Sequence, residues 1–190
     1  MELALDLKKR YTYADYLTWA DDKMRELING FIKMMSAPGT KHQRVCGRLT
    51  TRLTILIERN KGTCEVFPAP FDVRLPQNGE KADTQIYNVV QPDICVVCDP
   101  SKIDENGCIG APDLVVEIQS FSTARYDLTK KFDLYETSGV REYWVVFPND
   151  GIEVFLLQPD GKYDEGTKYK QGKIPVHIFD GCEIDIAEIL

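Results

Sequence analysis

The sequence predicts an α/β fold in which a mixed, mostly antiparallel central sheet is flanked by helices, formed as a single domain over residues 1–190. Two apolar runs of strand character, residues 89–98 and 112–120, are separated by a polar segment rich in turn residues. That spacing predicts adjacent antiparallel strands with a hairpin-like connection. Two segments with helical periodicity, residues 41–59 and 123–138, would cover the sheet.

Composition and charge exclude several classes of protein. A hydrophobic content of 43% and a charged content of 28% are typical of soluble globular proteins. No apolar run approaches the roughly 20 residues of a membrane span, and the first ten residues lack the apolar core of a secretory signal. We therefore expect a cytoplasmic protein without a membrane partner. The net charge of −7 predicts weak, salt-sensitive binding to nucleic acid without a metal or a partner.

The elements before the first apolar run are predicted from caps, turns and periodicity. Thr12 is a suitable N-cap for a short helix over residues 13–19. Asn29-Gly30 between two apolar-rich runs predicts a hairpin over residues 25–34, with Glu26 on its first strand. The helix over residues 41–59 has a basic polar side, and its apolar stripe is Val45, Leu49, Leu53, Leu56 and Ile57. Strands are expected over residues 64–67 and 71–75.

After the second run, Ser122 and Gly139 are suitable caps for the helix over residues 123–138. Residues 143–147 and 152–157 are expected to form a hairpin around residues 149–151. The last forty residues are polar, with short strand-like pieces.

The six cysteines do not have the spacing of a zinc site. Cys95 and Cys98 form a C-x-x-C pair, but positions i and i+3 of a strand point to opposite faces. Only two histidines are present, His42 and His177. We therefore expect reduced, mostly buried thiols rather than a zinc or disulfide framework.

Asp93, Asp113 and Glu117 interrupt the two apolar runs. A charged carboxylate in such a strand costs several kcal/mol unless a basic side chain, N–H donors or a metal ion compensates it. Asp113 shares a face with Glu117 but lies about 13 Å away, because a strand rises about 3.3 Å per residue. Asp93 on the neighbouring strand can come within about 5 Å of Glu117. Geometry therefore selects Asp93 with Glu117, and leaves Asp113 as a strand-start residue.

Two further positions have a structural and a functional interpretation. Asp127, Lys131 and Tyr135 are spaced i, i+4, i+8 and share one helix face. Lys131 either forms a surface pair with Asp127 or projects toward the carboxylates. His42, in the first turn of its helix, is either a solvated helix-end histidine or a contact to a substrate phosphate.

Together these residues resemble the Uma-two family, restriction-endonuclease-like proteins of the PD-(D/E)XK nuclease superfamily. The resemblance runs in order over nearly the whole chain. The matching positions are residues 26–30, His42, Pro92-Asp93, residues 111–117, Ser120, Ser122-Thr123, Asp127, Lys131, Tyr135 and residues 139–144.

The resemblance implies a restriction-endonuclease-like core in which Asp93 and Glu117 ligate Mg²⁺ or Mn²⁺. It also implies that Lys131 is a catalytic lysine displaced from the strand to the following helix, and that Glu26 is an additional acidic residue. Gln119 stands where the superfamily has its strand lysine, and Phe121 where the family usually has proline. Glutamine can hydrogen-bond a water but carries no charge. His42, Asp127 and Tyr135 are candidate additional site residues.

The function predicted from these residues is Mg²⁺-dependent hydrolysis of DNA phosphodiester bonds. Asp93, Glu117 and Lys131 are central, Gln119 is secondary and Glu26 is peripheral. Cutting both strands of a duplex with one site per chain would require a homodimer. The alternative is a catalytically inactive nuclease-fold domain that binds nucleic acid or another protein, which Gln119 and the acidic net charge favour.

Overall fold

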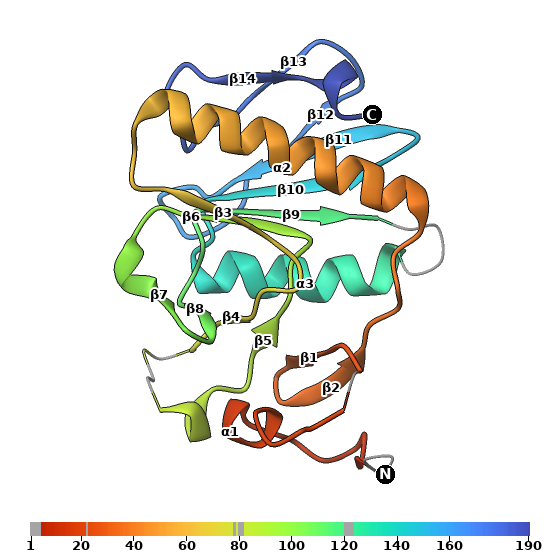
Figure 1. The fold of residues 1–190 in the computed structure, drawn as a ribbon, viewed down its shortest axis with the longest axis vertical. Coiled ribbons are helices and arrows are strands. Elements are labelled where there is room, and N and C mark those ends of the chain that lie inside the picture. Colours follow the sequence, from red (N-terminus) through yellow and green to blue (C-terminus); the bar gives the residue numbers. More distant parts are fainter. Residues whose placement is uncertain (1–4, 22, 78, 80–81, 120–123) are drawn as a thin grey trace.

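The computed structural model describes residues 5–21, 23–77, 79, 82–119 and 124–190, without the side chains of residues 124–128. The described chain forms two six-stranded sheets and a two-stranded one (Figure 1). The α/β class and the mixed character of the main sheet are confirmed. The second six-stranded sheet is a feature that the sequence did not predict. None of the helices in the described residues has the length and apolar composition needed to cross a membrane.

The central sheet has the strand order β12-β11-β10-β9-β6-β3. Its members are β3 (Glu65–Pro68), β6 (Ile94–Val97), β9 (Leu114–Ile118), β10 (Glu142–Phe147), β11 (Gly151–Leu156) and β12 (Thr167–Tyr169). Strands β9 and β10 are parallel, and the other neighbouring pairs are antiparallel. This confirms the mostly antiparallel sheet and the antiparallel pairing of the two apolar runs.

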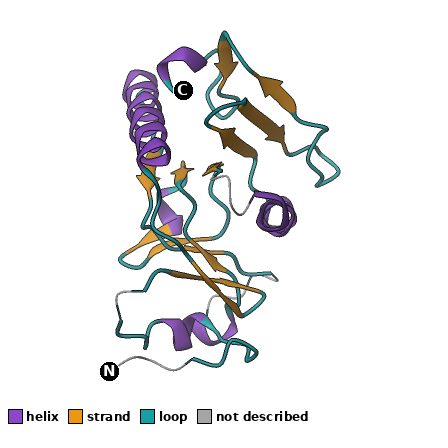
Figure 2. Cartoon of the chain, turned by 90° about the vertical axis from the view of Figure 1, so that its right-hand side faces the viewer, coloured by secondary structure: helices purple, strands orange, loops and turns teal. Residues whose placement is uncertain are grey.

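Two helices cover opposite faces of this sheet, α2 (Thr40–Asn60) and α3 (Ala124–Ser138). Figures 1 and 2 show them on either side of β9. On the α2 face, Val45, Leu49 and Leu53 pack with the strand residues Val96 and Val116. On the α3 face, a second cluster contains Cys95, Val115, Leu134, Tyr135 and Tyr143. Consecutive residues of β6 and β9 thus point to opposite clusters, so both faces of these strands are buried.

The second sheet has the order β2-β1-β5-β4-β8-β7 and lies beside α1 (Tyr13–Tyr16) in the lower half of Figure 1. Asn29 and Gly30 have the positive φ angles, 53° and 83°, that a tight two-residue hairpin turn requires. Its strands are β1 (Arg25–Ile28), β2 (Phe31–Met34), β4 (Val73–Arg74), β5 (Val89–Val90), β7 (Ile103–Asp104) and β8 (Gly107–Ile109).

The run over residues 89–98 is not one strand, which corrects the sequence prediction. It divides into β5 in the second sheet and β6 in the central sheet, with Gln91, Pro92 and Asp93 crossing between them. Pro92 has no N–H to donate to a ladder, so pairing stops there. The segment between β6 and β9 is also more than a hairpin loop, because it contains a 3₁₀ turn (Pro100–Lys102) and the β7–β8 hairpin.

The last forty residues contribute more to the core than their polar composition suggests. They contain β12, the antiparallel pair β13 (Lys173–Pro175) and β14 (Glu183–Asp185), and a 3₁₀ turn over Ile186–Glu188. Beyond β11, six apolar residues of this segment are buried in the same cluster as the apolar stripe of α2. These six are Ile174, Val176, Phe179, Ile184, Ile186 and Ile189.

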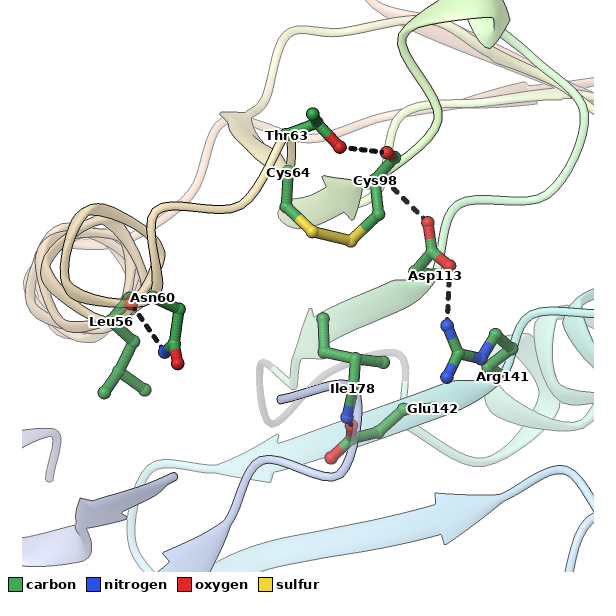
Figure 3. The surroundings of a disulfide bond; sticks show 9 residues. All are labelled: Leu56, Asn60, Thr63, Cys64, Cys98, Asp113, Arg141, Glu142 and Ile178. Carbon is green, nitrogen blue, oxygen red and sulfur yellow. Dashed lines mark hydrogen bonds and ion pairs between the residues drawn. A yellow bond between two sulfur atoms is a disulfide. The ribbon is translucent and has the colours of Figure 1, made fainter. Parts of the chain in front are cut away.

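Cys64 and Cys98 form a disulfide, contrary to the expectation that all six cysteines are reduced (Figure 3). The register of β3 with β6 pairs Glu65 with Val97, so the next residue on each side brings Cys64 opposite Cys98. Cys95 lies on the other face of β6, in the cluster under α3, as the i, i+3 argument predicts. The thiols of Cys46, Cys95, Cys108 and Cys182 are free.

We predict that reduction of this disulfide destabilises the protein by about 2–4 kcal/mol, because the bond closes a loop and so restricts the unfolded chain. The measurement is denaturant unfolding of the wild type with and without reductant. The double variant Cys64→Ser, Cys98→Ser should match the reduced wild type. Cys182→Ser, which removes a free thiol, should retain the full effect of the reductant. Equal stability of the oxidised and reduced wild type would contradict the prediction.

Candidate active site

The register of the two central strands brings two acidic residues together. Strand β6 pairs with β9 so that Ile94 is opposite Val116. One residue further along this register, Asp93 is opposite Glu117, as the strand argument predicts. Opposite residues of an antiparallel pair have Cβ atoms about 4.5–5.5 Å apart.

The carboxylate of Glu117 is buried and accepts two hydrogen bonds on one oxygen. Lys131 Nζ donates to Glu117 Oε1 at 2.9 Å, and the Tyr135 hydroxyl donates to the same atom at 2.7 Å. Both donors come from α3, whose i, i+4 spacing places them on one face. The functional interpretation of Lys131 therefore agrees with the geometry, since the ammonium group lies within hydrogen-bond distance of Glu117.

Lys131 also joins the first hairpin to this site. Its Nζ lies 2.7 Å from Oε1 of Glu26, whose side chain is 1% exposed. The backbone N–H of Gln91 donates to the same oxygen at 3.0 Å. Glu26 on β1 and Glu117 on β9 belong to different sheets, so the buried ammonium connects the two sheets through ion pairs.

Asp93 is held in the same manner as Glu117. Its Oδ2 accepts a hydrogen bond from the backbone N–H of Ile118 at 2.7 Å and lies 3.1 Å from Nε2 of His42. His42 reaches this position because α2 begins at Thr40, beside the end of β9. The imidazole is therefore part of the carboxylate cluster and not a solvated helix-end residue.

Charge and burial shift the pKa values of these groups. Burial raises the pKa of Glu117 to about 7, with the charges of Asp93 and Glu26 adding to the effect and Lys131 opposing it. Burial would lower the pKa of Lys131, but the charges of Glu117 and Glu26 outweigh it and raise that pKa. The hydrogen bond to Asp93 raises the pKa of His42 against the effect of burial. Lys131 is therefore protonated throughout the physiological range.

Two sequence-selected residues, Gln119 and Asp113, lie outside these contacts. Gln119 follows β9, and its backbone N–H donates to Val146 O at 2.8 Å; its half-buried side chain forms no hydrogen bond with any described residue. The side chain of Asp127 lies outside the described residues. Asp113 is at the other end of β9, where it accepts from Cys98 N–H at 2.8 Å and pairs with Arg141 at 3.0 Å (Figure 3).

Sequence reasoning missed the contributions of Gln91 and Ile118. Both act through backbone N–H groups, which a side-chain pattern does not reveal. Gln91 also reaches a half-buried acid, since its side-chain amide donates to Asp72 Oδ1 at 2.7 Å. Burial raises the pKa of Asp72, although its hydrogen bonds oppose the shift. The proline that follows Gln91 was the available signal of an irregular crossing.

The carboxylates of Asp93 and Glu117 are suitable as two protein ligands for a hard divalent cation. Asp93 and Glu117 each use one oxygen for the bonds above, and among the described residues no donor reaches Asp93 Oδ1 or Glu117 Oε2. No group of three or more His, Cys, Asp or Glu side chains in the described chain has the arrangement of a metal site. Two carboxylates suffice for Mg²⁺, which keeps several waters and takes further ligands from substrate phosphate.

The mixed sheet with helices on both faces defines the fold class as α/β, and a solved structure shares this fold. A crystal structure of a putative nuclease of the DUF820 family from Anabaena variabilis matches with a TM-score of 0.71 and 20% identity, over 94% of this chain and 96% of that one. The Uma2 (Uma-two) family, described as "Putative restriction endonuclease", matches residues 13–187. The chain belongs to this family, and the resemblance seen in the sequence is confirmed.

A relative of this chain is an uncharacterized protein from Synechocystis sp. The two are 28% identical over 154 residues, which is 80% of this chain and 74% of the relative. Family membership supports a nuclease-like function at a coarse level. The metal and the roles of individual residues do not follow from it.

We predict that Lys131→Met destabilises the metal-free protein in a pH-dependent manner. Without the ammonium, burial and the charge of Asp93 raise the folded-state pKa of Glu117 further above the unfolded value. Between the two values the native state binds more protons than the unfolded state, so stability falls as pH rises. The free energy of unfolding of Lys131→Met should be close to that of the wild type near about pH 4.5 and lower by about 3–5 kcal/mol near about pH 8.

The measurement is chemical unfolding in EDTA across this pH range. Lys162→Met is the matched control, because Lys162 also pairs with a buried glutamate, Glu136 at 2.8 Å, but its own side chain is 66% exposed. Lys162→Met should lower the free energy of unfolding by less than about 1 kcal/mol. A loss in Lys131→Met that does not change with pH would contradict the assigned burial of the ion cluster.

Proposed function

We propose that the protein is an endonuclease that hydrolyses DNA phosphodiester bonds with a Mg²⁺ or Mn²⁺ ion held by Asp93 and Glu117. The observation that supports this most directly is the juxtaposition of the two carboxylates with the ammonium group of Lys131, 2.9 Å from Glu117. A bound divalent cation supplies charge stabilisation at the phosphoryl oxygens and a hydroxide-like water at neutral pH. Family membership supports the same class of reaction.

In this proposal Lys131 contributes a fixed positive charge. Its raised pKa keeps the ammonium protonated, so it acts as a hydrogen-bond donor and not as a base. It holds Glu117 in place and adds positive potential on the side of the site that faces α3. Gln119 lies two residues beyond Glu117 and, by strand alternation, on the same side; there it can hydrogen-bond a water without adding charge.

DNA is the proposed substrate although the chain has a net charge of −7. Support comes from the first turns of α2, which bring His42 to Asp93 and also carry the exposed residues Lys41 and Arg44. Such side chains beside the site can contact phosphates. The acidic remainder of the chain implies that this contact weakens steeply as salt concentration rises.

The test is cleavage of supercoiled plasmid, single-stranded DNA and RNA in Mg²⁺, Mn²⁺ or EDTA. We expect metal-dependent cleavage of DNA that falls by at least about 100-fold in Asp93→Asn and Glu117→Gln, since even residues that merely support a ligand cost 10–100-fold. Asp113→Asn is the matched control, because Asp113 also follows a proline but pairs with Arg141, away from the site. It should retain activity.

Cleavage that persists in Asp93→Asn or Glu117→Gln would exclude the proposal. If the wild type neither cleaves nucleic acid nor binds Mn²⁺ in calorimetry, the inactive nuclease-fold alternative becomes the better explanation. Gln119 at the position of the strand lysine and the net charge of −7 are the observations that favour that alternative.

We further propose that two copies of the chain act together on duplex DNA, because one site per chain cuts one strand. Sedimentation velocity should show a species of twice the chain mass, at least when a DNA duplex is present. The plasmid should then be linearised without a long-lived nicked intermediate. A monomer both with and without DNA, accompanied by accumulation of nicked circles, would contradict this arrangement.

A further inference from the structure

We infer that Tyr135 is a positioning residue for Glu117. Its hydroxyl holds Oε1 of that carboxylate, so that Oε2 is presented to a divalent cation between Glu117 and Asp93. This inference rests on the proposed metal-dependent function. It assigns a role to a residue of α3 that itself touches neither metal nor substrate.

The first observation is the distribution of donors over the two carboxylates. Lys131 and Tyr135 both donate to Glu117 Oε1, at 2.9 and 2.7 Å. His42 and the backbone N–H of Ile118 both lie on Asp93 Oδ2, at 3.1 and 2.7 Å. Each carboxylate is therefore held at one oxygen by two donors. The rotation of each group is fixed, and its other oxygen is available to a ligand.

The second observation is that Tyr135 cannot move to another partner. Its side chain is 0% exposed and lies in the apolar cluster under α3. Its ring packs on that of Tyr143 with centroids 5.2 Å apart. Because the ring is buried, the hydroxyl cannot reach a substrate in solvent, which excludes a role as nucleophile or phosphate contact. What remains is the short hydrogen bond to Glu117.

Tyr143 provides an internal comparison. It belongs to the same cluster, and its hydroxyl is buried, but this hydroxyl has no hydrogen-bond partner among the described residues. Removing the Tyr143 hydroxyl therefore removes a buried oxygen from the same environment without touching a carboxylate. Tyr143→Phe is accordingly a matched control for Tyr135→Phe.

The experiment is calorimetric titration of Mn²⁺ into the wild type, Tyr135→Phe and Tyr143→Phe. Outer partners of metal ligands typically change metal affinity by 10–100-fold, so we expect the Kd for Mn²⁺ to rise by about this factor in Tyr135→Phe. In Tyr143→Phe it should stay within about 2-fold of the wild type. The phenylalanine ring preserves the packing of Tyr135, and Lys131 still holds Glu117, so Tyr135→Phe should fold; its melting temperature in EDTA checks this.

A rescue separates positioning from packing. Replacement of Tyr135 by 4-aminophenylalanine retains an N–H donor at the same point of the ring and should restore most of the Mn²⁺ affinity. Unchanged Mn²⁺ affinity in Tyr135→Phe, with binding intact in the wild type, would overturn the role of Tyr135 alone. Absence of Mn²⁺ binding in both the wild type and Tyr143→Phe would instead overturn the proposed metal function, and this inference with it.

Discussion

The ammonium group of the buried Lys131 lies between Glu26 and Glu117, and the candidate site depends on this ion cluster. Removing such a charge from water costs several kcal/mol unless good partners compensate it. Here the partners come from a hairpin of one sheet and a strand of the other, 2.7 and 2.9 Å away. The cluster therefore fixes how the two sheets meet as well as how Glu117 is oriented.

The same cluster explains why acidic residues can be concentrated there. The carboxylates of Glu26, Asp93 and Glu117 outnumber the cationic groups of Lys131 and His42, and this excess contributes to the raised pKa of Glu117. An added cation would relieve the repulsion between Asp93 and Glu117. In the proposed function the cation would lie at Asp93 and Glu117, whereas Glu26 accepts from Lys131 and from the N–H of Gln91 and anchors the lysine.

Features encoded in local pattern were predictable from the sequence, and features of long-range assembly were not. Helical periodicity predicted the buried stripe of α2, and the spacing between neighbouring strands predicted that Asp93 is opposite Glu117. Strands of two residues, such as Val73–Arg74 and Val89–Val90, are too short to show a period, so the second sheet was missed. The bond between Cys64 and Cys98 depends on pairing of β3 with β6, strands that lie far apart in the chain.

The two Pro-Asp pairs, Pro92-Asp93 and Pro112-Asp113, lie at opposite ends of the paired strands β6 and β9. The first contributes to the candidate site, and the second makes only structural contacts. In each pair the aspartate accepts from an N–H at the end of the partner strand: Ile118, the last residue of β9, for Asp93, and Cys98, just after β6, for Asp113. The register places Glu117 opposite Asp93 but Val97 opposite Asp113. Arg141 then neutralises Asp113, whereas Asp93 faces a second carboxylate. The opposing residue, and not the motif, therefore determines which aspartate is in a position to bind a cation.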